Sequence, residues 1–358
     1  MKRLIAVLLL AALLLAQAAL PALADEKEPN PIPVLSDAEI PPTPTGIHHY
    51  MLICMDRWNA ELNTSWTKNM KAWKTKWTDG LILLTMDELA HRVVLTSFIR
   101  DMLIMRPDGI YGRLNNFLYV DPTRDAAGWA WANHKNDVEG LNALVDTINS
   151  HFGLRIEKFI VVDFKQVENI IDAVGGVDID ITDREAHYLK NYTLPASSTT
   201  PPLVDGRGGV YHFTGHAAVI YMRIRKVKTR EYLHSDGTMR SDTQDYGRTY
   251  RTRTVLTTIA ESLKDISYED AQKLFKVVVD NTVYTNLSTD DLTEAFELAL
   301  ALKNVPVEHI RMPADGTKYE EFPHSGMATK QIDFEENRAV LHDFLFDQGY
   351  VVVDDEDE

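Results

Sequence analysis

Residues 214–253 read TGHAAVIYMRIRKVKTREYLHSDGTMRSDTQDYGRTYRTR, and this segment is densely cationic in an acidic chain. The whole chain has 53 acidic and 37 basic residues, which gives a formal net charge of −16. A local reversal of sign indicates a bound anion, and the planar fork of arginine suits bidentate contacts with phosphate oxygens. Because nucleic-acid binding needs a broad basic surface, the overall charge argues against that partner and favours a small anion held locally.

The same segment predicts two helices separated by a basic connector. A short helix is expected over residues 214–221, capped by Thr214, and a longer one over about 245–264. Arg223 and Arg225 stand two residues apart between them, so in an extended backbone both guanidinium groups would lie on one face.

Arg248 and Thr252 lie one turn apart near the start of the second predicted helix and continue its apolar stripe. They are therefore expected to point inward, where backbone N–H groups of a helix N-terminus also favour anions. The basic residues thus divide into an inner set and an outer, surface set. The inner set is Arg223, Arg225 and Arg248, with the polar Thr252 beside them, and the outer set is Lys226, Lys228, Arg230 and Arg240.

Outside this segment, hydrophobic periodicity predicts strands that alternate with helices, which indicates one α/β domain. Two of the strands, 80–86 and 92–97, are expected to pair as a hairpin, so that Asp79 lies at the same end as Arg100 and Asp101. Residues 182–210 lose periodicity and are expected to form a surface excursion. The other predicted strands are 50–55, 159–162, 177–181 and 309–312, and the other predicted helices are 137–150, 164–173, 268–278, 289–302 and 337–348.

The two ends of the chain differ in composition from the predicted domain. Residues 1–24 combine basic residues, an apolar run and an A-x-A site, which predicts a cleaved signal peptide or, alternatively, a retained membrane anchor. Both readings place the rest of the chain outside the cytoplasm. Residues 25–47 are rich in proline and acid and are expected to be a tether, 48–350 form the domain, and 351–358 form an acidic tail.

Several classes of site find no support in the sequence. Cys54 is the single cysteine, so an intramolecular disulfide is excluded, and its apolar surroundings favour a buried small side chain over a nucleophile. The histidines lack metal-ligand spacing, and no G-x-S-x-G motif is present. Zinc sites and serine hydrolase triads are therefore not expected.

Six short segments, in the right order, resemble the LytR-CpsA-Psr family of bacterial proteins that attach glycopolymers to the cell wall. The resemblance spans about residues 48–350, and the order of the segments makes it specific although each segment alone is weak. The segments are Met55-Asp56-Arg57, KTKWTDG around Asp79, Ser97-Phe98-Ile99-Arg100-Asp101, Val174-Gly175-Gly176-Val177-Asp178, the Thr214–Arg225 motif and Asp245-Tyr246-Gly247-Arg248 with Arg251.

The resemblance implies a mixed sheet between helices, an apolar cavity for a polyprenyl chain, and phosphotransfer outside the cytoplasm. A glycan would pass from a polyprenyl-pyrophosphate carrier to a peptidoglycan sugar hydroxyl at the outer face of the cytoplasmic membrane. Asp56 and Asp79 match the family's magnesium-binding carboxylates, with Mn²⁺ as the alternative ion. Asp101 is a candidate acceptor of the hydroxyl proton. The arginines expected around the pyrophosphate are Arg100, Arg113, Arg223, Arg225 and Arg248, with Thr252 beside them.

The sequence departs from the family pattern at three positions. Ile99 replaces a proline, Arg113 replaces a lysine, and Thr252 replaces a glutamine. These departures leave two alternatives to the transferase open. One is a non-catalytic binder of polyprenyl phosphates that acts as a carrier or regulator, and the other is a pyrophosphatase that acts on the same lipid.

Overall fold

The computed structural model describes residues 29–57, 77–107, 109–118, 136–191, 204–323 and 328–347. The leader expected over residues 1–24 and the tail over 351–358 lie outside these ranges. The chain divides into two units at Pro31, and the unit that starts at Ile32 contains all the helices and strands of the described residues. Among the described residues, no helix combines the length and apolar character needed to cross a membrane.

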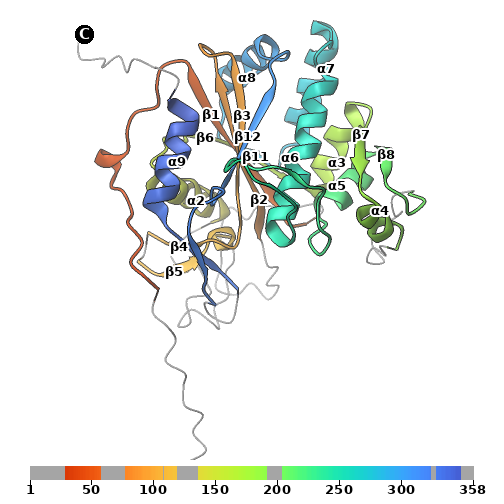
Figure 1. Ribbon diagram of the computed structural model, residues 1–358. Coiled ribbons are helices and arrows are strands. Elements are labelled where there is room, and N and C mark those ends of the chain that lie inside the picture. Colours follow the sequence, from red (N-terminus) through yellow and green to blue (C-terminus); the bar gives the residue numbers. More distant parts are fainter. Residues whose placement is uncertain are drawn as a thin grey trace, which may run out of the picture. The chain divides into compact units, whose positions relative to one another are not determined.

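A six-stranded mixed sheet forms the centre of this unit, with the order β11-β6-β1-β2-β3-β12 (Figure 1). Strands β1, β2 and β3 are antiparallel neighbours, whereas β6 and β12 run parallel to β1 and β3. The expected hairpin is confirmed as β2–β3, and the expected mixed sheet is confirmed as well. The strands are β1 (Ile47–Met55), β2 (Thr78–Asp87), β3 (Arg92–Phe98), β6 (Lys158–Asp163), β11 (Tyr284–Thr285) and β12 (Val307–Met312).

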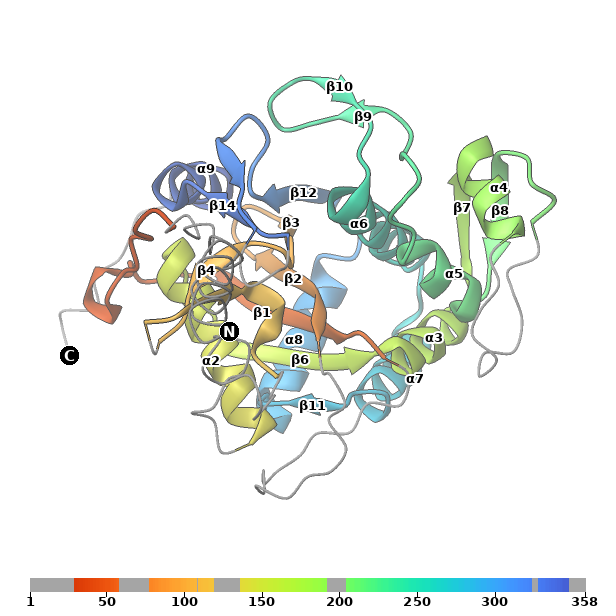
Figure 2. The ribbon, with the colours of Figure 1, turned by 90° about the horizontal axis from the view of Figure 1, so that it is seen from below.

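Helices cover both faces of the sheet (Figure 2). On one face, Met51 and Leu83 belong to the largest apolar cluster, which also contains residues of α2 (Asp137–Phe152) and α9 (Phe334–Phe346). The opposite face carries Tyr50 and Met86 and meets α8 (Thr289–Ala301), with α7 (Tyr268–Asp280) nearby. Alternate residues of one strand therefore serve two separate cores, as the two-residue repeat of a strand requires.

A second apolar cluster lies beside the sheet and includes Ile179, Leu189, Tyr221 and Val255. It joins the two-stranded sheet β7 (Val177–Ile181) and β8 (Gly209–Phe213) to the helices α3 (Phe164–Ala173), α4 (Asp183–Lys190), α5 (Gly215–Met222) and α6 (Gln244–Ser262). Gly215 lets α5 approach α3 closely, because a Cβ atom there would lie 2.0 Å from the backbone oxygen of Glu168.

Two segments that were expected to lack regular or packed structure differ from that expectation. Residues 183–190, expected within an aperiodic excursion, form α4, because Thr182 and Glu185 make a reciprocal capping box and Leu189 packs inward. Residues 32–46, expected within a tether, contact the domain: Ile32 and Ile40 are buried, and Arg155 donates to the backbone oxygen of Ile40. Three short hairpins complete the described fold: β4 (Leu103–Met105) with β5 (Tyr111–Arg113), β9 (Tyr232–Leu233) with β10 (Met239–Arg240), and β13 (Tyr319–Glu321) with β14 (Lys330–Ile332).

Candidate active site

The predicted carboxylates lie where β1 ends and β2 begins. Cys54 pairs with Gly80 and Met55 with Thr78, which leaves Asp79 as the additional residue of a β-bulge. A bulge changes the direction of a side chain relative to the regular pleat. Asp56 follows the last residue of β1, and its backbone N–H donates to the carbonyl oxygen of Trp77 at 2.9 Å. The antiparallel pairing thus brings the two carboxylates to the same end of the sheet.

Asp79 is buried and is held by two partners. Its Oδ2 atom forms an ion pair with Arg100, and its Oδ1 atom accepts from Nδ2 of Asn115 at 2.8 Å. Arg100 follows β3, so the ion pair confirms that both residues lie at the predicted end of the hairpin. Asn115 is a site residue that the sequence analysis did not single out. Its Oδ1 atom is buried and has no hydrogen-bond partner within the described part of the chain.

Three guanidinium groups lie close to the carboxylate group of Asp101. Arg113, at the end of β5, forms an ion pair with its Oδ1 atom. Nε of Arg100 lies 3.6 Å from the same oxygen, and Nη2 of Arg225 lies 3.9 Å from Oδ2. The β3–β4 connection and the segment after α5 therefore bring their charged side chains to one place, as the sequence predicted.

Arg223 and Arg225 do not lie in an extended strand, which corrects the sequence-based expectation. Arg223 is the C-cap residue of α5 and has right-handed helical backbone angles. Nη2 of Arg223 lies 3.6 Å from Oδ1 of Asp56, and its guanidinium group lies over the ring of Phe164 at 4.6 Å. The end of the helix, not a two-residue pleat, directs the two arginines toward separate carboxylates.

Asp245 belongs to one of the family segments, but no role in the site was predicted for it. It is buried in the first turn of α6, where Oδ1 accepts from Nε of Arg248 at 2.7 Å and Oδ2 accepts from the backbone N–H of Arg100 at 3.1 Å. An aspartate three residues before an arginine at a helix start was the available signal. Thr252 lies one turn after Arg248, and its hydroxyl donates to the Arg248 backbone oxygen at 3.1 Å. A role of Thr252 in binding stays a prediction.

The electrostatics of the cluster favour an incoming anion. Burial lowers the pKa of Arg100 to about 9, and the nearby Arg248 and Arg225 act in the same direction. Burial likewise lowers the pKa of Arg113 to about 10. Burial alone would raise the pKa of Asp245, but Arg248 and Arg100 outweigh it and lower that pKa. A bound anion would relieve the repulsion among these crowded cations.

Two donors in the cluster remain available to a ligand. Nε of Arg225 and Nη2 of Arg248 are buried, and neither has a hydrogen-bond partner in the residues that the structure describes. A buried donor without a partner is costly, and an oxyanion would satisfy both. Cys54 was expected to be buried, but it is only half-buried. Desolvation raises the pKa of its thiol to about 12, which disfavours the thiolate form that a nucleophile needs.

An apolar cavity of about 340 Å³ lies over the sheet face that carries Tyr50 and Leu52. Helices α7 and α8 and the residues after α6 form its other walls, with Leu263, Phe275 and Leu300 among them. Along β1, residues 50, 52 and 54 share one face because side chains alternate in a strand. That face continues to the strand end at which Asp56 lies, so the cavity and the charged cluster adjoin the same strand.

The side-chain oxygen atoms of the cluster are suitable ligands for a hard cation. Asp56 is 31% exposed, Asp79 is buried, and Asn115 adds an unpartnered amide oxygen. Mg²⁺ accepts one or two carboxylates and completes its shell with waters and substrate phosphates. A cation at Asp79 would have to take the place of Arg100. No group of three or more His, Cys, Asp or Glu side chains within the described ranges is placed to hold a metal ion.

Comparison with known proteins accounts for this combination of fold and charged cluster. A family model described as the LytR_cpsA_psr family matches residues 67–339. The chain belongs to the LytR-CpsA-Psr family. Two solved structures share the family fold: Bacillus subtilis TagV, with a TM-score of 0.57 at 18% identity, and TagT bound to LIIa-WTA, with a TM-score of 0.55 at 16% identity. The first covers 85% of this chain and 98% of TagV, and the second covers 84% and 91%.

Curated relatives from the LytR-CpsA-Psr family match at low identity. Biofilm regulatory protein A of Streptococcus mutans is 20% identical over 293 residues, which are 80% of this chain and 62% of that protein. The polyisoprenyl-teichoic acid--peptidoglycan teichoic acid transferase TagU of Bacillus mycoides is 26% identical over 192 residues, which are 52% of each protein. The chain therefore spans about half to three fifths of the length of these relatives.

Proposed function

We propose that this protein transfers a glycopolymer from a polyprenyl-pyrophosphate carrier to a sugar hydroxyl of peptidoglycan. The observation that carries the proposal is the pair of buried, unpartnered guanidinium nitrogens of Arg225 and Arg248, set in a cluster beside an apolar cavity. An amphipathic lipid pyrophosphate needs both environments at once. Membership of the family supports the proposal, as does the similarity to TagU, a polyisoprenyl-teichoic acid--peptidoglycan teichoic acid transferase.

In this proposal the arginines bind and orient the pyrophosphate. Arg225 and Arg248 would donate to its oxygens, while Arg100, Arg113 and Arg223 supply further positive charge at fixed positions. Charge that develops on the phosphoryl oxygens in the transition state is stabilised most by donors already in place. The carboxylates that hold each arginine therefore contribute by positioning.

The proposed reaction is an attack by the acceptor hydroxyl on the phosphorus that carries the glycan. The bond from that phosphorus to the bridging oxygen breaks, and the lipid leaves as polyprenyl monophosphate. The hydroxyl proton would pass to Asp101, the carboxylate shared by the three arginines. Mg²⁺, or Mn²⁺ in its place, would be held by Asp56 and Asp79 and would supply further charge neutralisation on the phosphates.

We also propose that the reaction takes place at the outer face of the cell membrane, as the leader pattern of residues 1–24 suggests. Protease added to intact cells should then digest the protein without lysis. Protection in intact cells together with digestion after lysis would contradict this placement.

One incubation separates the transferase from its alternatives. The protein is mixed with a lipid-pyrophosphate-linked glycan and peptidoglycan fragments, with Mg²⁺, with Mn²⁺ or with EDTA, and the products are followed by mass spectrometry. A transferase gives glycan phosphate joined to peptidoglycan and free lipid monophosphate. Hydrolysis products alone would indicate a pyrophosphatase. Bound lipid without any product would indicate a carrier. Full turnover in EDTA would show that the reaction does not need a divalent metal ion.

The apolar cavity gives an independent test of the lipid part of the proposal. Ala299 lines the cavity on α8, so Ala299→Phe should narrow it without touching the arginines. We expect weaker binding of a long-chain polyprenyl pyrophosphate and unchanged binding of a short-chain analogue. Equal losses for both lipids would show that the cavity does not hold the chain.

A further inference from the structure

A second cavity, of about 390 Å³, lies between α6, the edge strand β12 and the β9–β10 hairpin. Its size is typical of small-molecule sites. The residues that line it include Arg253, Thr254, Thr258, Glu261 and His309, and none of the charged residues of the candidate active site is among them. Polar and apolar groups both line this cavity, whereas the cavity over the central sheet is almost wholly apolar.

Arg253 is the unusual residue of this cavity, and comparison with Arg251 shows why. Arg251 is fully buried and satisfied: Nε donates to Glu185 at 2.7 Å, and its other nitrogens donate to two backbone oxygens at 3.0 and 2.9 Å. Arg253 is also buried, but within the described part of the chain its one hydrogen bond goes to the hydroxyl of Ser97. No carboxylate in the described residues lies within 4.0 Å of it. A buried guanidinium group that no carboxylate neutralises favours the binding of an anion beside it.

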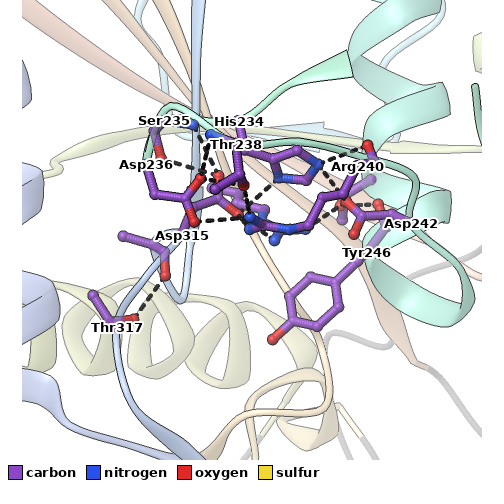
Figure 3. Close-up of polar contacts among 12 residues, drawn as sticks. His234, Ser235, Asp236, Thr238, Arg240, Asp242, Tyr246, Asp315 and Thr317 are labelled. Atoms are coloured by element: carbon purple, nitrogen blue, oxygen red, sulfur yellow. Dashed lines mark hydrogen bonds and ion pairs between the residues drawn. The ribbon is translucent and has the colours of Figure 1, made fainter. Parts of the chain in front are cut away.

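Asp242 and Asp315 favour the charged form of Arg253 electrostatically. Both carboxylates are already engaged by other cations (Figure 3). Asp315 accepts from Nη2 of Arg240 at 2.6 Å and contacts Nδ1 of His234 at 2.9 Å. Asp242 accepts from Nη1 of Arg311 at 2.6 Å, and Arg311 also pairs with Asp315. These contacts fix the β9–β10 hairpin as a wall of the cavity and leave the charge of Arg253 without a direct counterion.

The remaining lining residues suit a ligand that carries hydroxyl groups. The hydroxyls of Thr254 and Thr258 donate to helix backbone oxygens at 3.1 and 2.9 Å, so their own oxygens can accept. Burial lowers the pKa of His309 to about 4, so its ring is neutral at pH 7 and lies 3.0 Å from the Thr257 hydroxyl. Glu261 offers another acceptor at the cavity lining.

Stacking of an apolar ring on the cavity wall is not favoured. The Tyr232 ring lies between the rings of His234 and Tyr250, at centroid distances of 4.1 and 4.3 Å with small interplanar angles. Both faces of Tyr232 are therefore covered. Tyr232 therefore offers neither ring face to a ligand, and Arg253 with the hydroxyl groups supplies the directional contacts.

We propose that this cavity binds a small polyhydroxylated anion, a sugar phosphate or a sugar carboxylate. Its oxyanion contacts Arg253, and its hydroxyls donate to Thr254, Thr258 and Glu261. The site is distinct from the pyrophosphate cluster, so the proposal does not depend on the transferase activity.

The test is calorimetric titration of the full-length protein in which Arg223→Gln and Arg225→Gln weaken the other anion site. Glucose 6-phosphate, glucuronate, glucose and inorganic phosphate are titrated in turn. We expect one site for at least one of the two sugar anions, with glucose at least tenfold weaker. The sugar anion that binds shows whether the cavity recognises a phosphate or a carboxylate group. No binding of either sugar anion, or equal binding of glucose, would overturn the proposal.

Variants inside the cavity make the test specific. Arg253→Gln should weaken the sugar anion at least tenfold, and Arg253→Lys should weaken it less. Because Arg253 is buried, circular dichroism must show that each variant is folded. Thr254→Val with Thr258→Val keeps every charge and should weaken the sugar anion but leave inorganic phosphate unchanged. Unaltered affinity for the sugar anion in this double variant, or in folded Arg253→Gln, would refute the assignment.

Discussion

Replacing Arg225 by glutamine should remove activity while leaving the fold intact. The Arg225 side chain is 38% exposed, and the nearest carboxylate oxygen, on Asp101, lies 3.9 Å from its guanidinium group. Ion pairs of this kind contribute about 0.2–1 kcal/mol to stability, so the free energy of unfolding should fall by less than about 1 kcal/mol. Loss of one preorganised donor from a transition state costs about 10²–10³ in rate. The proposed transfer should therefore fall by that factor.

Arg230 provides the matched control, because it is 41% exposed and pairs with Asp180 at 2.9 Å, outside the cluster. Arg230→Gln should change stability as little as Arg225→Gln does and leave transfer at the wild-type rate. Urea denaturation measures stability, and mass spectrometry of the transferred glycan measures rate. Full turnover in Arg225→Gln would refute the role of this arginine. Equal losses in both variants would show that the effect comes from net charge and not from position.

Three further predictions concern buried groups. Asp79→Asn should lower the free energy of unfolding by about 1–3 kcal/mol in urea, since it leaves Arg100 with a weaker partner, and an unchanged value would contradict the ion pair. Glu185→Ala should cost about 3–5 kcal/mol, because it leaves Arg251 charged in the core, and a loss below about 1 kcal/mol would show that water reaches this site. Burial lowers the pKa of His151 to about 4, so the unfolded chain binds a proton below about pH 6.5 that the folded chain excludes. The contribution of His151 to stability should therefore fall by about 3 kcal/mol as pH drops from 6.5 to 4, and His151→Gln should show a shallower fall in total stability; an identical slope would rule out this histidine as a source.

The sequence predicted the parts of the site that strand ends determine. Asp79 and Arg100 were placed together because a hairpin brings its two outer ends together, and the structure confirms their ion pair. Asp56, Arg113 and Arg225 also lie against charged partners in the same region. The order of the strands in the sheet was not accessible, because periodicity reports which face of a strand is buried and not which strand lies beside it.

The site residues whose roles were not predicted from the sequence depend on contacts between distant segments. Asp245 acts through the backbone N–H of Arg100, and Asn115 acts through Asp79, and neither pair shares a local pattern. The short hairpins β9–β10 and β13–β14 were missed because strands of two or three residues carry too little periodicity. Arg223 and Arg225 were expected to share one face of an extended segment, because spacing alone cannot distinguish a helix end from extended backbone.

The pairing of β3 with β12 has a consequence for how the molecule reaches its folded state. β3 lies in the first third of the chain, whereas its parallel neighbour β12 lies near the end. Until residues 307–312 arrive, one backbone edge of β3 has no strand partner from the central sheet, and an open edge is a template for aggregation. Such long-range pairing also slows folding. Shortened chains that stop before residue 307 should therefore accumulate as insoluble material, whereas the full chain completes its sheet only after nearly all of it is available.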